Sequence, residues 1–191
     1  GDVDIETSSG GVAMDGFAAA SLRIQGSSSR IELSDGAIDG KLDLENTSSR
    51  ISAVGVEAAS YRLVSSSGDV FLDGCGGLLS LRTTAGTIKV ENATAAHLEI
   101  ETSSGGVTFA GSLDTEGASS IKSTAGNVRL WLPSDSAFDV DIATTSGSIK
   151  TDFVIKTTTI DDDRVVGTVD DGGPMLEIKT SSGDVTLTSV D

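Results

Sequence analysis

The stretch TSSGDV, residues 180–185, decides the fold of this chain because close variants of it recur along the whole sequence. Each copy begins with a small residue, continues through Ser or Thr, and closes on Val or Ile. The closing residues are Val12, Ile31, Ile51, Val70, Ile88, Val107, Val128, Ile149 and Val185. They lie 18 to 21 residues apart, except for a gap of 36 before the last. A period of this length is the signature of a repeat architecture.

Two short runs of alternating apolar residues flank each copy of this phrase. The position seven residues before the closing residue is aliphatic in every copy: Ile5, Ile24, Leu44, Leu63, Leu81, Ile100, Ile121, Ile142 and Ile178. The position nine residues before it is also large and mainly apolar, with Ser119 as the exception. Alternation with a period of two indicates β-strands, whose successive side chains point to opposite faces.

The repeats predict an all-β fold, a single-stranded, right-handed parallel β-solenoid of nine coils of about 19 residues. A unit this short cannot bury its apolar face alone, so each coil is expected to stack on the next along the chain. Right-handed connections are the rule between parallel strands. We expect one domain over residues 1–191, and we expect the recurring glycine to occupy a turn that favours positive φ.

Residues 152–173 depart from the repeat. Two β-rich runs, 153–160 and 164–169, flank the acidic turn 161–163, which predicts a β-hairpin inserted before the last coil. Such a hairpin is expected to cover a sheet edge. At the other end, Val3 and Ile5 already occupy strand positions, so we expect any targeting segment to be missing from this sequence.

The composition excludes several classes of partner. The chain has 13 Lys and Arg against 29 Asp and Glu, a formal charge of −16, and no basic cluster. Nucleic acid and anionic lipid surfaces are therefore not expected partners, since both require clustered cations. No apolar run is long enough to span a bilayer. Cys75 is the only cysteine, so no disulfide can form within the chain.

Three segments carry a resemblance to a known family. They are the phrase at 180–185 with its relative at 65–70, the run NVRLWLP at 127–133, and FDVDIATTSGSI at 138–149. Together they resemble the DUF4097 type of bacterial adhesin-like proteins of unknown function, over essentially the whole chain. The resemblance implies a β-solenoid attached to the bacterial envelope. It implies no catalytic residues.

The sequence nominates no catalytic, cofactor-binding or metal-binding residue. His97 is the sole histidine and has no local partner for a Ser-His-Asp unit or a metal site, which favours a corner residue. Cys75 is in register with Phe17, Val56 and Ala93, so an inert buried thiol is expected. One acidic group offers oxygen ligands for calcium, although a solvated turn is the favoured interpretation. It consists of Asp161, Asp162, Asp163, Asp170 and Asp171.

The recurring Thr is the most suggestive feature. Stacking is expected to align Thr7, Thr83, Thr102, Thr144 and Thr180 into a hydroxyl ladder. Regular hydroxyl arrays bind carbohydrate or ice, but Ser and Thr also satisfy backbone groups in turns, which is the favoured interpretation. Trp131, near Pro133, is expected in a bent or bulged strand rather than on a sugar-stacking surface. The sequons at Asn46 and Asn92 are expected to be turn asparagines.

These observations predict a non-enzymatic, adhesin-like interaction module of the cell envelope or extracellular surface. Its expected partner is a protein or glycan ligand, with no nucleic acid, no membrane insertion and no cofactor. One alternative is a structural scaffold within a larger envelope-stress or assembly protein. The other is a carbohydrate-active enzyme with a groove along the solenoid, for which the sequence nominates no carboxylate pair.

Overall fold

The computed structural model describes residues 1–161 and 163–191, and all of its regular elements are β-strands. Among these residues there is no helix, and hence none that could cross a membrane. The strands are β1 (Asp2–Asp15), β2 (Ala18–Ala19), β3 (Ser21–Asn46), β4 (Ile51–Ser65), β5 (Val70–Asp73), β6 (Gly76–Thr83), β7 (Ile88–Thr102), β8 (Val107–Leu113), β9 (Ser119–Ala125), β10 (Val128–Pro133), β11 (Phe138–Ser146), β12 (Ile149–Thr151), β13 (Ile155–Asp161), β14 (Arg164–Val169), β15 (Met175–Ser182) and β16 (Val185–Val190).

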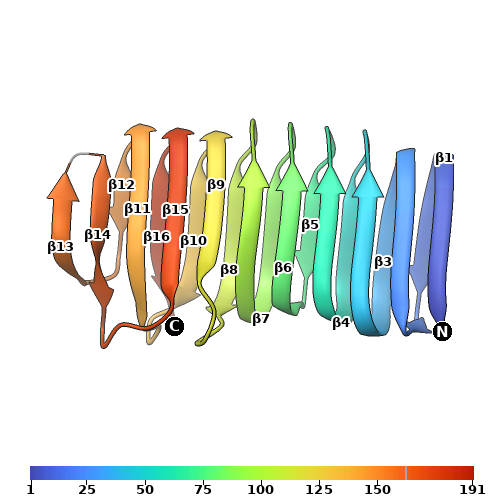
Figure 1. Cartoon of the computed structure of the whole chain (residues 1–191), viewed down its shortest axis with the longest axis horizontal. Helices are drawn as coiled ribbons and strands as arrows, with labels where there is room; N and C mark the ends of the chain where they lie inside the picture. Colours follow the sequence, from blue (N-terminus) through green and yellow to red (C-terminus); the bar gives the residue numbers. More distant parts are fainter. Residues whose placement is uncertain (162) are drawn as a thin grey trace.

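The strands pair in parallel from one repeat to the next, as the period predicts. β1 pairs with β3, and β3 with β4, so that Val12 lies beside Ile31 and Ile31 beside Ile51. The same pairing continues through Val70 and Ile88. The prediction of an all-β parallel β-solenoid with a spacing of about 19 residues is confirmed, with about seven turns. Figure 1 shows the resulting elongated stack of strands.

Each turn contributes strand segments to two faces that meet at the TSSGDV-like phrase, which we call the corner. We call the face formed by the segments before the corner the upstream face, and the other the downstream face. β9, β15 and β11 lie on the upstream face, in front in Figure 1, and β10, β16 and β12 lie on the downstream face. The apolar columns of both faces point inward and form one continuous core.

Exceptions within these columns have local explanations. Ser119 interrupts an aliphatic column, and its buried hydroxyl accepts the backbone N–H of Leu98 at 3.0 Å. The closing residues Val12 and Ile149 are only half-buried. They belong to β1 and β12, which lie at opposite ends of the stack and so have a neighbouring strand on one side only.

The expectation that the coils stack in chain order is wrong for the last two repeats. Leu176 of β15 pairs with Ser119 of β9 on one side and with Val140 of β11 on the other. On the downstream face Val185 lies between Val128 and Ile149 in the same way. The final repeat is therefore inserted between the two repeats that precede it in the sequence.

Two features of the strands account for this insertion. β14 pairs antiparallel with the outer edge of β11, so only the inner edge of β11 is left for β15. On the downstream face β16 covers β10 along all six of its residues, whereas β12 has only three. The longer strand buries Leu132, near the end of β10, completely.

Within the interval 152–173, β13 and β14 run antiparallel with a register shift between Thr157 and Thr159. Phe153, just before β13, is buried and packs edge-on against Phe138 of β11, with ring centroids 5.5 Å apart. These two strands thus extend the upstream face beyond β11 and lie at one end of the molecule in Figure 1.

The glycines of the corner do not adopt the positive φ expected of them. Gly10 has a φ of 102°, but Gly68, Gly86, Gly105, Gly126, Gly147 and Gly183 all lie outside that region. These six instead stack on one another, and a Cβ on any of the last five would overlap with the carbonyl oxygen of the glycine in the neighbouring turn. Close approach of backbones, and not turn conformation, is the reason for glycine here.

Candidate functional site

The predicted hydroxyl ladder forms a column, but the column faces into the corner. Thr83, Thr102, Thr144 and Thr180 are 3–5% exposed. The hydroxyl of Thr144 donates to the carbonyl of Gly183 at 3.1 Å, and that of Thr83 to the carbonyl of Gly68 at 3.3 Å. Thr83 and Thr144 therefore have the expected structural role, and burial leaves the four side chains no surface for a ligand.

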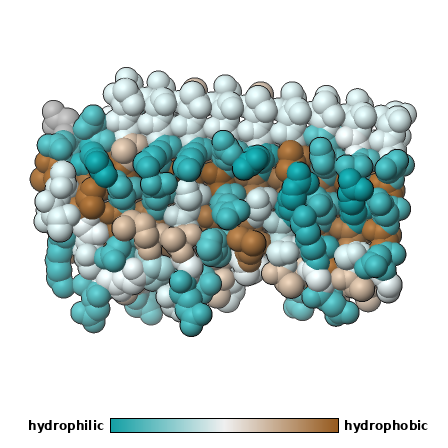
Figure 2. All heavy atoms as spheres, viewed as in Figure 1, coloured by the Kyte–Doolittle hydropathy of each residue, from teal (hydrophilic) through white to brown (hydrophobic). Residues whose placement is uncertain are grey.

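The next column along the chain is the one that reaches solvent. Its members are the hydroxyl residues at the second position of every copy of the phrase, all exposed: Ser8, Ser27, Thr47, Ser66, Thr84, Ser103, Thr124, Ser181 and Thr145. A second exposed column beside it contains Ser9, Ser28, Ser48, Ser67, Ala85, Ser104, Ala125, Ser182 and Ser146. We call the two columns together the hydroxyl ridge. It runs along the corner and is the pale band at the top of Figure 2.

The signal for this ridge in the sequence is the second position of the phrase and not the recurring Thr of the first position. The second position of the phrase is Ser or Thr in every copy, whereas the first also accepts Gly26 and Asn46. Both of these replace a Thr of the buried column, and the amide of Asn46 donates to the backbone oxygens of Ser29 and Ser49. Alternation of side chains along a strand then places the second position outside.

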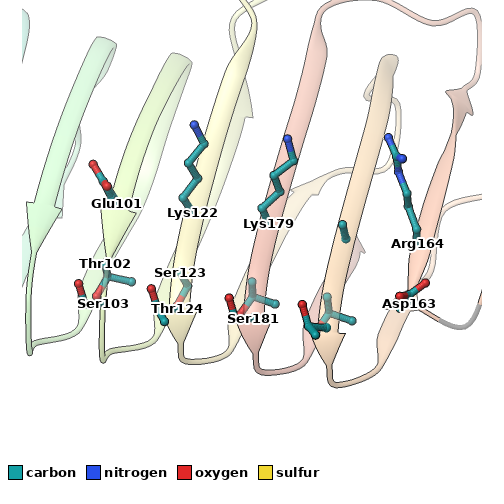
Figure 3. Close-up of a pocket in the computed structure, with 14 residues that line it drawn as sticks. Glu101, Thr102, Ser103, Lys122, Ser123, Thr124, Asp163, Arg164, Lys179 and Ser181 are labelled. Atoms are coloured by element: carbon teal, nitrogen blue, oxygen red, sulfur yellow. The ribbon is translucent and has the colours of Figure 1, made fainter.

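A groove borders the ridge on the upstream face (Figure 3). It has a volume of about 440 Å³, and a single row of residues crosses it in strand register. Glu101 of β7 lies beside Lys122 of β9, and Lys122 beside Lys179 of β15. Ala143 of β11 and Arg164 of β14 complete the row. Ser103, Thr124 and Ser181 of the ridge line the same groove.

Most charges in this groove are paired. Arg82 forms an ion pair with Glu101 at 3.0 Å. Arg164 donates hydrogen bonds to both carboxylate oxygens of Asp141, at 2.9 and 3.1 Å. Lys179 forms an ion pair with Glu177, and this hydrogen bond lowers the pKa of the Glu177 carboxyl. Lys122 has no ion-pair partner within 4.0 Å among residues 1–161 and 163–191. The row is thus locally cationic in a strongly acidic protein.

A second depression, far along the chain from this groove, contains Cys75 and Tyr61. Cys75 is buried beside Val56 and Ala93, as its register predicts. The Tyr61 hydroxyl donates to the Val56 carbonyl at 2.5 Å and accepts the Ala58 N–H at 2.9 Å. Burial raises the pKa of the Cys75 thiol to about 12, which keeps it in the unreactive protonated form.

The Cys75 thiol makes the fold sensitive to alkali. Its pKa is 9.0 when unperturbed and about 12 in the folded chain, so the unfolded state loses this proton first. The free energy of unfolding is therefore expected to fall as the pH rises from about 9 to 12. Urea denaturation at several pH values across this range measures this dependence. The free energy of unfolding should fall less steeply with pH for Cys75→Ala than for the wild type. Equal pH dependence in the two proteins would contradict the assignment.

The other residues considered for catalysis or metal binding do not come together in one site. His97 is half-buried on β7, against the backbone at Gly117. Asp161, Asp163, Asp170 and Asp171 are exposed, and Asp162 lies outside the described residues. Among the residues described, no group of three His, Cys, Asp or Glu is placed to hold a metal ion.

The expectation for Trp131 is wrong. Trp131 does not mark a bulge, because β10 keeps continuous register with β16 from Val128 to Pro133. Trp131 is half-buried between Ala110 and Thr188. Of the two sequons, Asn46 is buried, while Asn92 is exposed with a φ of 50°.

Comparison with known proteins agrees with the fold. The model of one family, Toastrack DUF4097, matches residues 20–188. Searches of curated proteins and of solved structures gave no match. The matched span contains every stacked repeat after the first, the six stacked corner glycines and most of the hydroxyl ridge. Because it covers most of the 191 residues, the chain belongs to the Toastrack DUF4097 family.

Proposed function

We propose that this domain is a non-enzymatic, adhesin-like interaction module of the bacterial cell envelope or surface, and that the hydroxyl ridge binds glycan. We further propose that the domain is a right-handed stack of nine coils and that the 152–173 hairpin covers one end of it. The observation that carries it is the ridge itself, where every turn presents an exposed hydroxyl at the same position. No cofactor, nucleic acid or membrane insertion takes part.

The chemistry of the ridge supports a glycan rather than a compact ligand. Each hydroxyl is both donor and acceptor, as are the hydroxyls of a sugar. Adjacent turns repeat about every 4.8 Å, which is close to the length of one sugar unit in an extended chain. A polymer lying along the ridge can therefore form the same contact in successive turns, and many weak contacts add through multivalency.

Removing hydroxyls from the ridge should weaken glycan binding without unfolding the protein. The triple variant Thr84→Ala, Ser103→Ala, Thr124→Ala removes three adjacent ridge hydroxyls. Each lost hydrogen bond costs about 1 kcal/mol, so affinity for a glycan found on an array should fall by at least about tenfold. Exposed sites of this kind tolerate substitution within about 0.5 kcal/mol.

A matched triple variant, Thr87→Ala, Thr94→Ala, Thr115→Ala, removes three exposed hydroxyls outside the ridge. It should bind like the wild type. Equal binding by all three proteins would place the ligand elsewhere. Antibody labelling of intact and permeabilised producing cells tests the surface location, and labelling only after permeabilisation would favour an internal scaffold.

A further inference from the structure

We infer that the groove crossed by Lys122, Lys179 and Arg164 binds an acidic saccharide, with its carboxylate or sulfate groups against these cations. This inference rests on the proposed glycan-binding function and assigns a chemical class to part of the ligand. It concerns the segment of the hydroxyl ridge formed by Ser103, Thr124, Ser181 and Thr145, which lines the groove.

The cations are placed on a regular line. Lys122 and Lys179 are direct partners on adjacent parallel strands, so their Cα atoms lie about 5 Å apart. Arg164 follows two strands further along the same row. In Figure 3 the three side chains extend in the same direction from neighbouring strands. An anion on successive sugars of a chain lying across the strands would meet one cation after another.

Lys122 and Lys179 are adjacent like charges, and the one carboxylate of Glu177 interacts with both of them. Charges directly opposite on neighbouring strands destabilise a sheet when they have the same sign. Lys179 has Glu177, but Lys122 has no acidic partner within 4.0 Å among the described residues, because Arg82 holds the adjacent Glu101. A ligand carboxylate or sulfate would give Lys122 a direct ion-pair partner.

The paired cations keep donors for a ligand. A lysine ammonium has three donors and an arginine guanidinium five. Lys179 uses one donor on Glu177, and Arg164 uses its Nε and Nη2 on Asp141. These ion pairs therefore orient the two side chains along the row without exhausting their hydrogen-bonding capacity.

The total charge of −16 does not prevent such binding. At physiological salt the Debye length is about 8 Å, so an anion in the groove interacts mainly with the groove lining. That lining has three cations, Lys122, Lys179 and Arg164, against Glu101 and Asp163. Asp141 and Glu177, which lie outside the lining, each pair with one of the cations.

The groove lining favours a saccharide over a nucleic acid. Single-stranded nucleic acids bind through aromatic side chains on which bases stack, together with cations. The fourteen lining residues include no aromatic one, but they include eight with hydroxyl groups. Four of these are exposed and can reach a ligand, namely Ser103, Thr124, Thr145 and Ser181. A polyhydroxylated anion matches this mixture.

Calorimetry with paired oligosaccharides tests the inference. An oligogalacturonate of defined length and its carboxyl-reduced, neutral counterpart differ only in charge. The wild-type protein should bind the acidic form at least about tenfold more tightly, and Lys122→Gln with Lys179→Gln should abolish this preference. Lys89→Gln is the matched control, since Lys89 is an exposed lysine of the downstream face that pairs with Glu91 at 2.8 Å.

The outcomes separate this inference from the proposed function. If the double variant keeps the preference, or if the wild type shows none, the inference is wrong even when neutral glycan still binds to the ridge. A sulfated oligosaccharide in a further titration distinguishes sulfate from carboxylate as the bound group. Binding of inorganic sulfate as tight as that of the acidic oligosaccharide, at constant ionic strength, would overturn the saccharide assignment and leave a simple anion site. If Lys89→Gln also lost binding of the acidic oligosaccharide, the assignment of the binding site to this groove would be wrong.

Discussion

Gly105→Ala is expected to destabilise the domain by more than about 3 kcal/mol, which lowers Tm by roughly 10 °C for a chain of this size. A Cβ on Gly105 would overlap with the carbonyl oxygen of Gly86 and lie 2.7 Å from its carbonyl carbon. Both are backbone atoms, so no side chain can move aside. The turns would have to separate where the parallel strands are hydrogen-bonded, and the loss of those bonds would spread to neighbouring turns.

Gly106→Ala provides a control one residue away. A Cβ there would approach only the carbonyl oxygen of Asn127, at 3.5 Å, which is an ordinary contact, and its φ is not in the positive range. Replacing a glycine at such a site is neutral or stabilising by up to about 1 kcal/mol. Thermal and urea denaturation of the two variants measure the difference. Similar stabilities would show that the glycine stack does not set the packing of the corner.

The pair Ala125→Cys and Ser182→Cys is expected to form a disulfide almost completely on mild oxidation. Ala125 of β9 and Ser182 of β15 are direct partners in parallel register and both are exposed. Adjacent strands bring Cα atoms to about 5 Å, which is within the range that a disulfide bridges. The native Cys75 is buried and does not compete. Mass spectrometry of the non-reduced protein detects the bond.

The control pair, Ala125→Cys with Ser146→Cys, should not form a disulfide. Ser146 of β11 is two strands away because Ser182 lies between them, and two strand spacings of about 4.8 Å exceed the disulfide limit of about 7 Å. Stacking of the repeats in chain order predicts the opposite result for both pairs. The experiment therefore decides the order of the last two repeats without a structure determination.

The part of the fold that could be predicted is the part fixed within one repeat. Alternating apolar positions such as Ile100 and Val107 specify the strands and their inward faces, and a constant period specifies parallel stacking. Burial of the Cys75 thiol followed from the same register. The ridge could also have been found, had the second position of the phrase been followed instead of the first.

The groove could not be predicted, because its row depends on which repeats are neighbours. Lys122 and Lys179 are 57 residues apart in the sequence, and chain order would have put Ala143 between them. A pattern that repeats in every coil gives each coil the same local preference for a partner. Such a pattern therefore does not determine which of two similar coils pairs with a given strand edge.

The sequence by itself determined the solenoid, because burying one alternating face in every 19-residue unit has a single solution, the stacking of parallel strands. Only the tertiary structure decided the order of the last repeats, through the occupation of the β11 edge by β14 and the better cover that β16 gives to β10. It also decided the role of the corner glycines, since their requirement comes from the approach of a neighbouring backbone and not from their own φ. Contacts between turns, which no single repeat encodes, thus assemble the cationic row beside the hydroxyl ridge.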